Sequence, residues 1–561
     1  MSSRRACNMK LSSLLSDGVV LQRNQTICIW GTVDNTEKAL QMLIKVAFAG
    51  LKKTCNPNQE GDFEIEFPAM KEGGPYTIDV SCFMNDTECE SSIHVEDVLI
   101  GDVWLLGGQS NMELPVARTL DRYADEVKNA NNPYIRKFQV PQVYNFHAPS
   151  ETLSGGQWDA VTPETVYQFS GAGYFFAVKD YEINKVPIGL LHTAQGGAHI
   201  EAFIGEERLK NVGSFLRDRA EKRQEDMTCD CDKNGSCKYC YEKLLAEDRN
   251  DKMVEETIAQ DAKNQEDWSK DLADRDEGFK QGWNCGEWKD TKDSITGTVE
   301  VPNMWNHLEI GKIRGSFWLQ YTVEVPKHWV NQDVQLRLGS LVDADITYVN
   351  GVEVGRTEYR YPPRRYRLPK NVLVAGKNVI TVRLVSDNNV AGFKEDMPYC
   401  LKFGEEEIDL KGIWKYRIGA TTKEVGSQTF FPWRPCGLYN GMIYPLHHLK
   451  LKGFLFYQGE SNSAHPEDYE FLFRAMIEEW RDLFNQQDIP FVYAQLPYFM
   501  GEGPEIGTDR WERLRHSQQK VLDMPHTAMA VLYDLGQYNE LHPQNKKEVA
   551  ARLYDAYLQC K

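Results

Sequence analysis

Short apolar segments that alternate with helical patterns constrain the fold of this chain more than any other feature. Five of them are VLIGDVWLLG, PIGLLHT, KGFLFYQG, PFVYAQLPY and AMAVLYDLG, which begin at residues 98, 187, 452, 490 and 528. Behind Pro466, apolar residues up to Phe484 recur at helical spacing. Strands that are apolar throughout and alternate with helices form parallel sheets covered on both faces. We therefore expect a three-layer α/β/α domain.

Segments of another kind flank and interrupt this α/β pattern. Residues 1–97 hold short alternating strand patterns between Gly, Asn and Asp, which predict a small N-terminal β-sandwich domain. Residues 98–275 and 406–561 carry the two parts of the α/β domain. Residues 276–405 are again rich in strand patterns, with a hairpin signal at Asn350-Gly351. We therefore expect 276–405 to be a β domain inserted into the α/β domain.

Charge and hydropathy exclude several classes of partner. The net charge is -18, from 64 basic and 82 acidic residues, which repels phosphate backbones and anionic lipid surfaces. We therefore expect neither nucleic acid nor a membrane as a partner. No apolar run reaches the ~18 residues of a membrane span, and residues 1–20 lack the uninterrupted apolar stretch of a secretory peptide. These features predict a cytoplasmic protein, and they give no indication of its oligomeric state.

The highly charged, helical segment 206–275 contains a cluster of four of the thirteen cysteines. The cluster consists of Cys229, Cys231, Cys237 and Cys240, whose spacing would let four thiolates surround one structural zinc ion. The alternative is an exposed loop with free thiols or a disulfide, and the remaining cysteines are expected to be mostly buried thiols. Four thiolates leave no position for a catalytic water, which disfavours a metal-dependent hydrolase.

Polar or glycine-rich elements follow four of the predicted strands. These elements are Gly108-Gln109-Ser110-Asn111, Gln195-Gly196-Gly197-Ala198, Gln458-Gly459-Glu460-Ser461-Asn462 and Asn539-Glu540-Leu541-His542-Pro543. In an open parallel sheet, ligands bind outside the carboxyl ends of the strands. Core packing does not explain four such elements, so we expect the active site at this edge of the sheet.

Two of these elements supply the groups that ester hydrolysis needs first. Ser110 lies between a glycine turn and a predicted helix start, where its hydroxyl is exposed for nucleophilic attack. Taken alone, a serine in that position is more often a helix cap. His542 precedes a proline at a predicted helix start and is the candidate base. Weaker alternatives for the base are His447, His448 and His465.

Ester hydrolysis also needs hydrogen-bond donors for the oxyanion of the tetrahedral intermediate, each worth about 10²–10³ in rate. The candidates are the N–H of Ser110, a glycine N–H from Gly196 or Gly197, and the side-chain amide of Gln458. Considered singly, the glycines could form a tight turn and Gln458 an ordinary loop hydrogen bond. We expect these donors to converge beside the serine hydroxyl.

The four elements together resemble the sialate O-acetylesterase family of SGNH-type hydrolases, whose relatives include acetyl xylan esterases. The matching blocks are SDGVVLQR…IWG at 16–31, GDVWLLGGQSNMELPV at 101–116, PIGLLHTAQGGAHIEAFI at 187–204, LYNGMIYPL…LKGFLFYQGESN at 438–462 and NELHPQNKKEVAARL at 539–553. The resemblance implies an SGNH-type α/β/α hydrolase domain that removes acetyl groups from carbohydrates without a cofactor. It also implies roles by position: Ser110 as nucleophile, His542 as general base and later acid.

The same resemblance leaves the third member of the catalytic group open. Gly197 or its neighbour Gly196, together with Gln458, would complete the oxyanion hole. The usual orienting aspartate, three residues before the histidine, is here Asn539. Glu540 is therefore our first choice for this role and Asp534 the alternative. A backbone carbonyl would also serve, since the third group mainly fixes the histidine tautomer.

The inserted β segment resembles the jelly-roll sugar-binding domain of family 2 glycosidases. The matching pieces lie at 315–326, 336–355 and 373–384. Xylan-acting bacterial members of the esterase family carry such an insertion, which favours plant polysaccharide fragments over sialic acids as substrate. The insertion could instead only support the catalytic domain. A carbohydrate-binding protein with an inactive esterase domain is the alternative function, which the presence of Ser110, Gln458 and His542 disfavours.

Overall fold

The chain divides into two compact units, residues 1–254 with 430–561, and residues 255–429. The structure, a computed structural model, describes residues 8–34, 36–84, 87–222, 239–288, 296–387, 390–426, 428–499, 507–536 and 540–560. The predicted ends of the inserted segment, 276 and 405, fall inside the second unit. Within the described ranges, no helix is both long and apolar enough to span a membrane.

A largely parallel sheet forms the centre of the first unit. Its six parallel strands are, in spatial order, β9 (Asn132–Gln139), β11 (Ile188–His192), β8 (Thr87–Gly108), β24 (Gly453–Tyr457), β25 (Phe491–Ala494) and β26 (Thr527–Ala530). At one edge, β10 (Trp158–Val161) pairs antiparallel with β9. Strands β11, β24 and β25 are buried along their whole length, as strands covered on both faces must be. Each of the five apolar segments singled out in the sequence contributes one strand.

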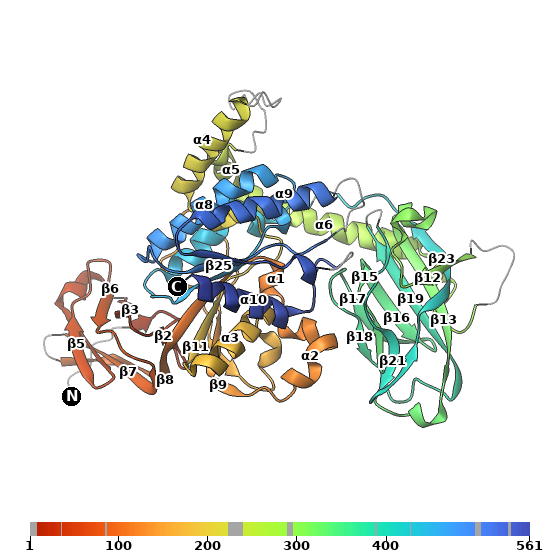
Figure 1. The fold of residues 1–561 in the computed structure, drawn as a ribbon, viewed down its shortest axis with the longest axis horizontal. Coiled ribbons are helices and arrows are strands. Elements are labelled where there is room, and N and C mark those ends of the chain that lie inside the picture. The colour runs from red at the N-terminus through yellow and green to blue at the C-terminus, as the bar shows by residue number, and fades with distance from the viewer. Residues whose placement is uncertain are drawn as a thin grey trace. The chain divides into compact units, whose positions relative to one another are not determined.

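Helices cover both faces of this sheet. On one face, α3 (Gly171–Asn184) packs against α10 (Lys546–Gln559), and on the other α8 (Pro466–Leu483) packs against α9 (Gly507–Lys520) (Figure 1). The helix expected behind Pro466 is α8, and its periodic apolar residues face the core. The unit also contains α1 (Ser110–Glu113), α2 (Leu120–Val127), α4 (Glu206–Lys222) and α5 (Tyr241–Asp248).

Strand β8 belongs to the N-terminal β part as well as to the central sheet. Its first half pairs antiparallel with β7 (Gly73–Met84), and its second half lies between β11 and β24. The predicted domain boundary at 97/98 therefore falls within one strand, which continues through Asp97 although the φ of that residue is 57°. The other N-terminal strands are β1 (Met9–Leu11), β2 (Val20–Gln22), β3 (Ile27–Val33), β4 (Met42–Phe48), β5 (Leu51–Cys55) and β6 (Asp62–Phe67).

Antiparallel sheets make up most of the second unit. The larger sheet consists of β12 (Thr296–Val301), β23 (Gly412–Thr421), β13 (Gly315–Val325), β19 (Gly376–Ser386), β16 (Ala344–Val349) and β17 (Val352–Thr357). A smaller one consists of β18 (Arg365–Arg367), β14 (Gln335–Leu338), β21 (Tyr399–Phe403) and β22 (Glu406–Asp409), and β15 (Leu341–Val342) pairs with β20 (Gly392–Phe393). Side chains of both larger sheets share one apolar core. Asn350 and Gly351 join β16 to β17 with φ of 50° and 84°, as a tight hairpin turn requires.

The charged segment 206–275 is helical over most of its described residues, which form α4, α5 and α6 (Asp251–Arg275), and α7 (Glu277–Lys280) follows it. Of the cysteine cluster, Cys229, Cys231 and Cys237 lie outside the described residues. Cys240 is described and is disulfide-bonded. The zinc site therefore stays a prediction.

Candidate active site

Ser110 begins a short helix immediately after strand β8. The chain turns at Gly108, whose φ is 119°, and a Cβ there would lie 2.1 Å from the carbonyl oxygen of Tyr457. Only glycine fits this position, because a side chain would collide with the neighbouring strand β24. The turn places the serine hydroxyl at the carboxyl edge of the sheet, where the first amides of α1 have no carbonyl partner within the helix.

His542 meets Ser110 at this edge, although 432 residues separate them in the sequence. The Nε2 atom of His542 lies 2.8 Å from Oγ of Ser110. Glu540 is buried beside them, and its Oε1 accepts the backbone N–H of His542 at 2.8 Å. This bond closes a local turn that fixes the loop in front of α10. The predicted nucleophile and base are thus within direct hydrogen-bond distance, with a carboxylate holding the histidine loop.

The other residues considered for these roles lie elsewhere. Asp534 is exposed and pairs with Arg552 at 2.5 and 2.6 Å, and this guanidinium lowers the pKa of Asp534 to about 2. Asp534 is therefore part of a surface ion pair, while Asn539 lies outside the described residues. The paired histidines have other partners: Nδ1 of His447 lies 2.8 Å from the carbonyl oxygen of Tyr444, and His448 lies against Glu64. His465 precedes α8.

The two glycines after β11 have different surroundings. A Cβ on Gly196 would lie 2.7 Å from Oε2 of Glu113 and 3.8 Å from Cβ of Ser110, so Gly196 lies close behind the nucleophile. Its N–H donates to the Glu113 carboxylate. Gly197 has a φ of 74°, and its carbonyl accepts the hydroxyl of Ser461 at 2.8 Å. The N–H of Gly196 therefore already has an acceptor in the structure.

The amide of Gln458 is engaged in the structure. Its Nε2 donates to Oδ1 of Asn462 at 2.6 Å and to the carbonyl of Ala198 at 3.2 Å. These two bonds use both amide hydrogens. Gln458 therefore links the segment after β24 to the segment after β11. Donation to an oxyanion, the role that we expected, would require the longer bond to Ala198 to be exchanged.

A buried polar network behind the nucleophile received no role in the sequence analysis. Nδ2 of Asn111 donates to Glu460 at 2.6 Å and to the carbonyl of Leu541 at 3.0 Å, while Nζ of Lys546 donates to Oδ1 of Asn111 at 2.5 Å. Burial raises the pKa of Glu460 to about 7 and lowers that of Lys546 to about 8. Since Leu541 adjoins His542, this network holds the histidine loop against α1. In the sequence, this network was indicated only by Asn111 and Glu460, which stand within the motifs quoted above.

Aromatic and acidic side chains border the glycine block, and the sequence analysis did not single them out. Nε1 of Trp433 donates to the carbonyl of Gly196 at 2.7 Å, and Phe430 stacks on Trp433 with ring centres 4.3 Å apart. Nε2 of Gln142 donates to Glu113 at 2.6 Å, and burial raises the pKa of this carboxyl. Such a rim offers both stacking and hydrogen bonding to a carbohydrate.

Within the described residues, one group of side chains brings metal-ligand atoms close together. It consists of Cys28, Glu64 and His448, whose ligand atoms all lie within 4.8 Å of one another. Cys28 and Glu64 belong to the N-terminal strands β3 and β6. His448 lies 3.2 Å from Glu64 within this group, whereas the chemistry at the sheet edge draws on Ser110 and His542.

Comparisons with known proteins identify a family whose model matches this chain. Residues 100–229 and 401–559, slightly more than half of the chain, match the model of a carbohydrate esterase family described as sialic acid-specific acetylesterase. The sialate O-acetylesterase of Mus musculus is 36% identical over 141 residues, which cover 22% of this chain and 26% of that protein. The Homo sapiens enzyme is 34% identical over 135 residues, covering 21% and 25%. The chain thus matches about a quarter of the length of these relatives.

One solved structure is similar over nearly the whole chain. It is a carbohydrate acetylesterase from Xanthomonas citri, with 23% identity and a TM-score of 0.54. The match covers 98% of this chain and 74% of that one. At this identity the match shows a shared fold.

Proposed function

We propose that this chain, which belongs to the sialic acid-specific acetylesterase family of carbohydrate esterases, hydrolyses acetyl esters on sugars through an acyl-enzyme. The observation that carries the proposal is the 2.8 Å contact between Oγ of Ser110 and Nε2 of His542. A hydroxyl with a histidine base at this distance is the arrangement of nucleophilic catalysis. The names of the curated relatives, sialate O-acetylesterases, support the same activity.

The reaction follows from the placement of the side chains. Ser110 attacks the acetyl carbonyl while His542 accepts its proton, and the resulting oxyanion is held by the N–H groups of Ser110 and Gly197. Each such donor contributes about 10²–10³ in rate. The intermediate collapses, the C–O bond to the sugar breaks, and His542 returns the proton to the leaving alcohol. A water molecule, deprotonated by His542, then attacks the acyl-enzyme and releases acetate, which restores Ser110.

Glu540 is the third member of the catalytic group in this proposal. Its buried carboxylate accepts the backbone N–H of His542 and so fixes the loop that presents the imidazole to Ser110. Asp534 is a poor candidate, because Arg552 already neutralises its carboxylate. An orienting backbone carbonyl remains the alternative to Glu540.

The finer assignments are proposals as well. The first unit, with its parallel strands and helices on both faces, would be an SGNH-type hydrolase domain, and the second a jelly-roll sugar-binding domain. Acetylated plant oligosaccharides would then be substrates alongside acetylated sialic acids, in the cytoplasm and without a catalytic cofactor. The cysteine cluster would hold a structural zinc ion only if Cys240 is not oxidised.

Acetate release tests the proposed function. The full chain is incubated with acetylated xylo-oligosaccharides and, separately, with O-acetyl sialic acid, and acetate is quantified over time. We expect turnover of at least one substrate, and we expect Ser110→Ala to lower it by three or more orders of magnitude, since loss of a catalytic serine can cost ~10⁶. Circular dichroism verifies that the variant is folded. Equal turnover by wild type and variant would contradict the proposal.

A further inference from the structure

A thiol, a carboxylate and an imidazole meet at the N-terminal strands of the first unit. Cys28 lies on strand β3, Glu64 on the neighbouring strand β6, and His448 in the segment that leads into β24. One ligand atom of each lies within 4.8 Å of the other two. The proposed esterase mechanism uses none of these side chains, although each of them is a type that binds metal ions.

The separations of these atoms match those between two ligands of one zinc ion. Zinc binds nitrogen and oxygen at ~2.0–2.2 Å and sulfur at ~2.3 Å, so two ligands of a tetrahedral ion lie ~3–4 Å apart. Nδ1 of His448 and Oε2 of Glu64 are 3.2 Å apart. Sγ of Cys28 lies within 4.8 Å of both, a distance that rotation of the exposed Glu64 side chain and the thiol can close.

Packing holds the imidazole of His448 in place. The ring stacks on the indole of Trp30, with ring centres 5.0 Å apart and planes at 28°. Trp30 is buried on β3, two residues after Cys28, and the ring of His447 lies 4.0 Å from that of His448. Burial lowers the pKa of His448, so the ring is neutral near pH 7, as a metal ligand must be. A ligand fixed in this way loses little freedom when it binds an ion.

The thiol of Cys28 lies half-buried beside negative charge. Burial and the carboxylate of Glu64 raise the pKa of Cys28, and Glu66, which stands opposite Cys28 on β6, adds to the rise. Near pH 7 the thiol therefore keeps its proton when no cation is bound. A metal ion deprotonates the thiol that coordinates it, so a dication would release this proton to the solvent and balance the carboxylate.

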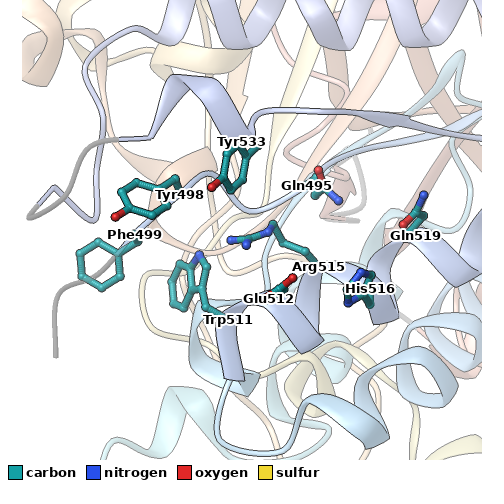
Figure 2. A pocket seen from close by; sticks show the side chains of 9 residues that line it. All are labelled: Gln495, Tyr498, Phe499, Trp511, Glu512, Arg515, His516, Gln519 and Tyr533. Atoms are coloured by element: carbon teal, nitrogen blue, oxygen red, sulfur yellow. The ribbon is translucent and has the colours of Figure 1, made fainter. Parts of the chain in front are cut away.

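The pocket between α9 and the segments after β25 and β26 lacks a comparable set of ligands. Figure 2 shows one histidine and one carboxylate in its largely aromatic lining, His516 and Glu512. Among the residues that the structure describes, only the group of Cys28 brings three ligand atoms close enough to share an ion. The ligands that one ion needs are therefore found at β3 and β6 and not in this pocket.

We propose that Cys28, Glu64 and His448 bind one zinc ion, which joins strands β3 and β6 to the segment before β24. Zinc accepts thiolate, imidazole and carboxylate together, whereas calcium and magnesium take oxygen ligands. Three protein ligands leave the fourth tetrahedral position to water. Because β24 ends at Tyr457, directly before Gln458, the ion fastens the N-terminal strands to a strand of the active-site edge. The inference is independent of the proposed function.

Calorimetric titration with zinc chloride tests the site. The full chain is freed of metal with a chelator and kept under nitrogen without a reducing agent, so that the disulfide of Cys240 stays intact. We expect the wild type to bind zinc and Glu64→Gln to bind it about tenfold or more weakly, since even partners outside the ligand set change metal affinity 10–100-fold. Glu64 is exposed, so this variant keeps the packing of β6.

A matched variant separates ligation from general charge. Glu66 is exposed on the same strand, and its carboxylate is not in the ligand group, so we expect Glu66→Gln to bind zinc nearly as the wild type does. Saturating zinc should raise the melting temperature of the wild type and of Glu66→Gln by about 2 °C or more, and that of Glu64→Gln less. Circular dichroism verifies that each variant is folded.

Cobalt(II) identifies the thiolate ligand. When it replaces zinc, a bond to sulfur gives a charge-transfer band in the near ultraviolet, and we expect Cys28→Ser to remove this band. Cys560→Ser, which alters another half-buried thiol, should keep it. Failure of the wild type to bind zinc overturns the inference, as does equal affinity of wild type and Glu64→Gln. Equal losses in the Glu64 and Glu66 variants, or a cobalt band that survives in Cys28→Ser, overturn it as well.

Discussion

Replacing Glu460 with glutamine isolates the energetic cost of the buried network behind the nucleophile. Glu460 is 8% exposed, and its Oε1 accepts the side-chain amide of Asn111 at 2.6 Å. Glutamine has nearly the same shape, and its carbonyl can accept the same bond. The substitution therefore removes the ionisation of the carboxyl and leaves the packing in place.

The sign and size of the effect follow from the pKa of Glu460. Burial raises it from a usual value of 4.5 to about 7. Between these values the folded chain holds a proton that the unfolded chain has lost, so stability falls as pH rises from about 4.5 to about 7. A tenfold difference in acidity corresponds to about 1.4 kcal/mol. The raised pKa thus costs the wild type about 3 kcal/mol above pH 7, and almost nothing below pH 4.5.

Thermal unfolding of wild type and Glu460→Gln, followed at intervals from pH 4.5 to 7.5, measures this cost. The range stops below the pKa of Lys546, which is about 8. We expect the melting temperatures of the two proteins to diverge as pH rises, with the variant the more stable at neutral pH. Glu182→Gln, an exposed carboxyl on α3, is the control and should follow the wild type. Parallel profiles for wild type and Glu460→Gln would refute the reasoning.

Substitutions at three further positions test the catalytic group. Gly197→Ala should lower both the melting temperature and acetate release, because its φ is 74° and its Cβ would lie 2.1 Å from the ring of Trp433. Glu540→Ala should reduce kcat about tenfold or more. Glu540→Gln should reduce it less, because glutamine can still accept the N–H of His542. Equal activity of wild type and Glu540→Ala would favour a backbone carbonyl as the orienting group. Asp534→Asn should leave kcat unchanged, since its partner is Arg552 at the surface, and a large loss of kcat would reinstate Asp534 as the catalytic acid.

Much of the sheet and its edge could be predicted from the sequence, because both leave local patterns. The apolar strands are short and uninterrupted, and each is followed by a polar or glycine-rich element. Ser110 and His542 both follow predicted strands, so the sequence predicts that they lie at the same edge of the sheet. The continuity of β8 across residues 97 and 98 could not be predicted, because Asp97 is typical of a turn, and the strand continues through it with a φ of 57°.

The hydrogen-bond partners within the site could not be predicted, because they depend on which acceptor lies closest to each donor in the folded chain. In sequence, Gly196 and Gly197 are equivalent, yet it is the N–H of Gly196 that the Glu113 carboxylate accepts. The sequence predicts an oxyanion donor at Gln458, and it does not reveal that Asn462 accepts its amide in the structure. Lys546 stands in a polar run that is typical of an exposed helix start, and the fold buries it against Asn111.

Covalent labelling of the catalytic serine tests the central claim most directly. The full chain is treated with a fluorophosphonate, which reacts with activated serine hydroxyls, and the modified residue is located by peptide mass spectrometry. We predict labelling at Ser110, absent from Ser110→Ala and slowed strongly in His542→Ala, because Nε2 of His542 lies 2.8 Å from the hydroxyl. Labelling at another residue, or equal rates with and without the histidine, would contradict a nucleophile formed by Ser110 and His542.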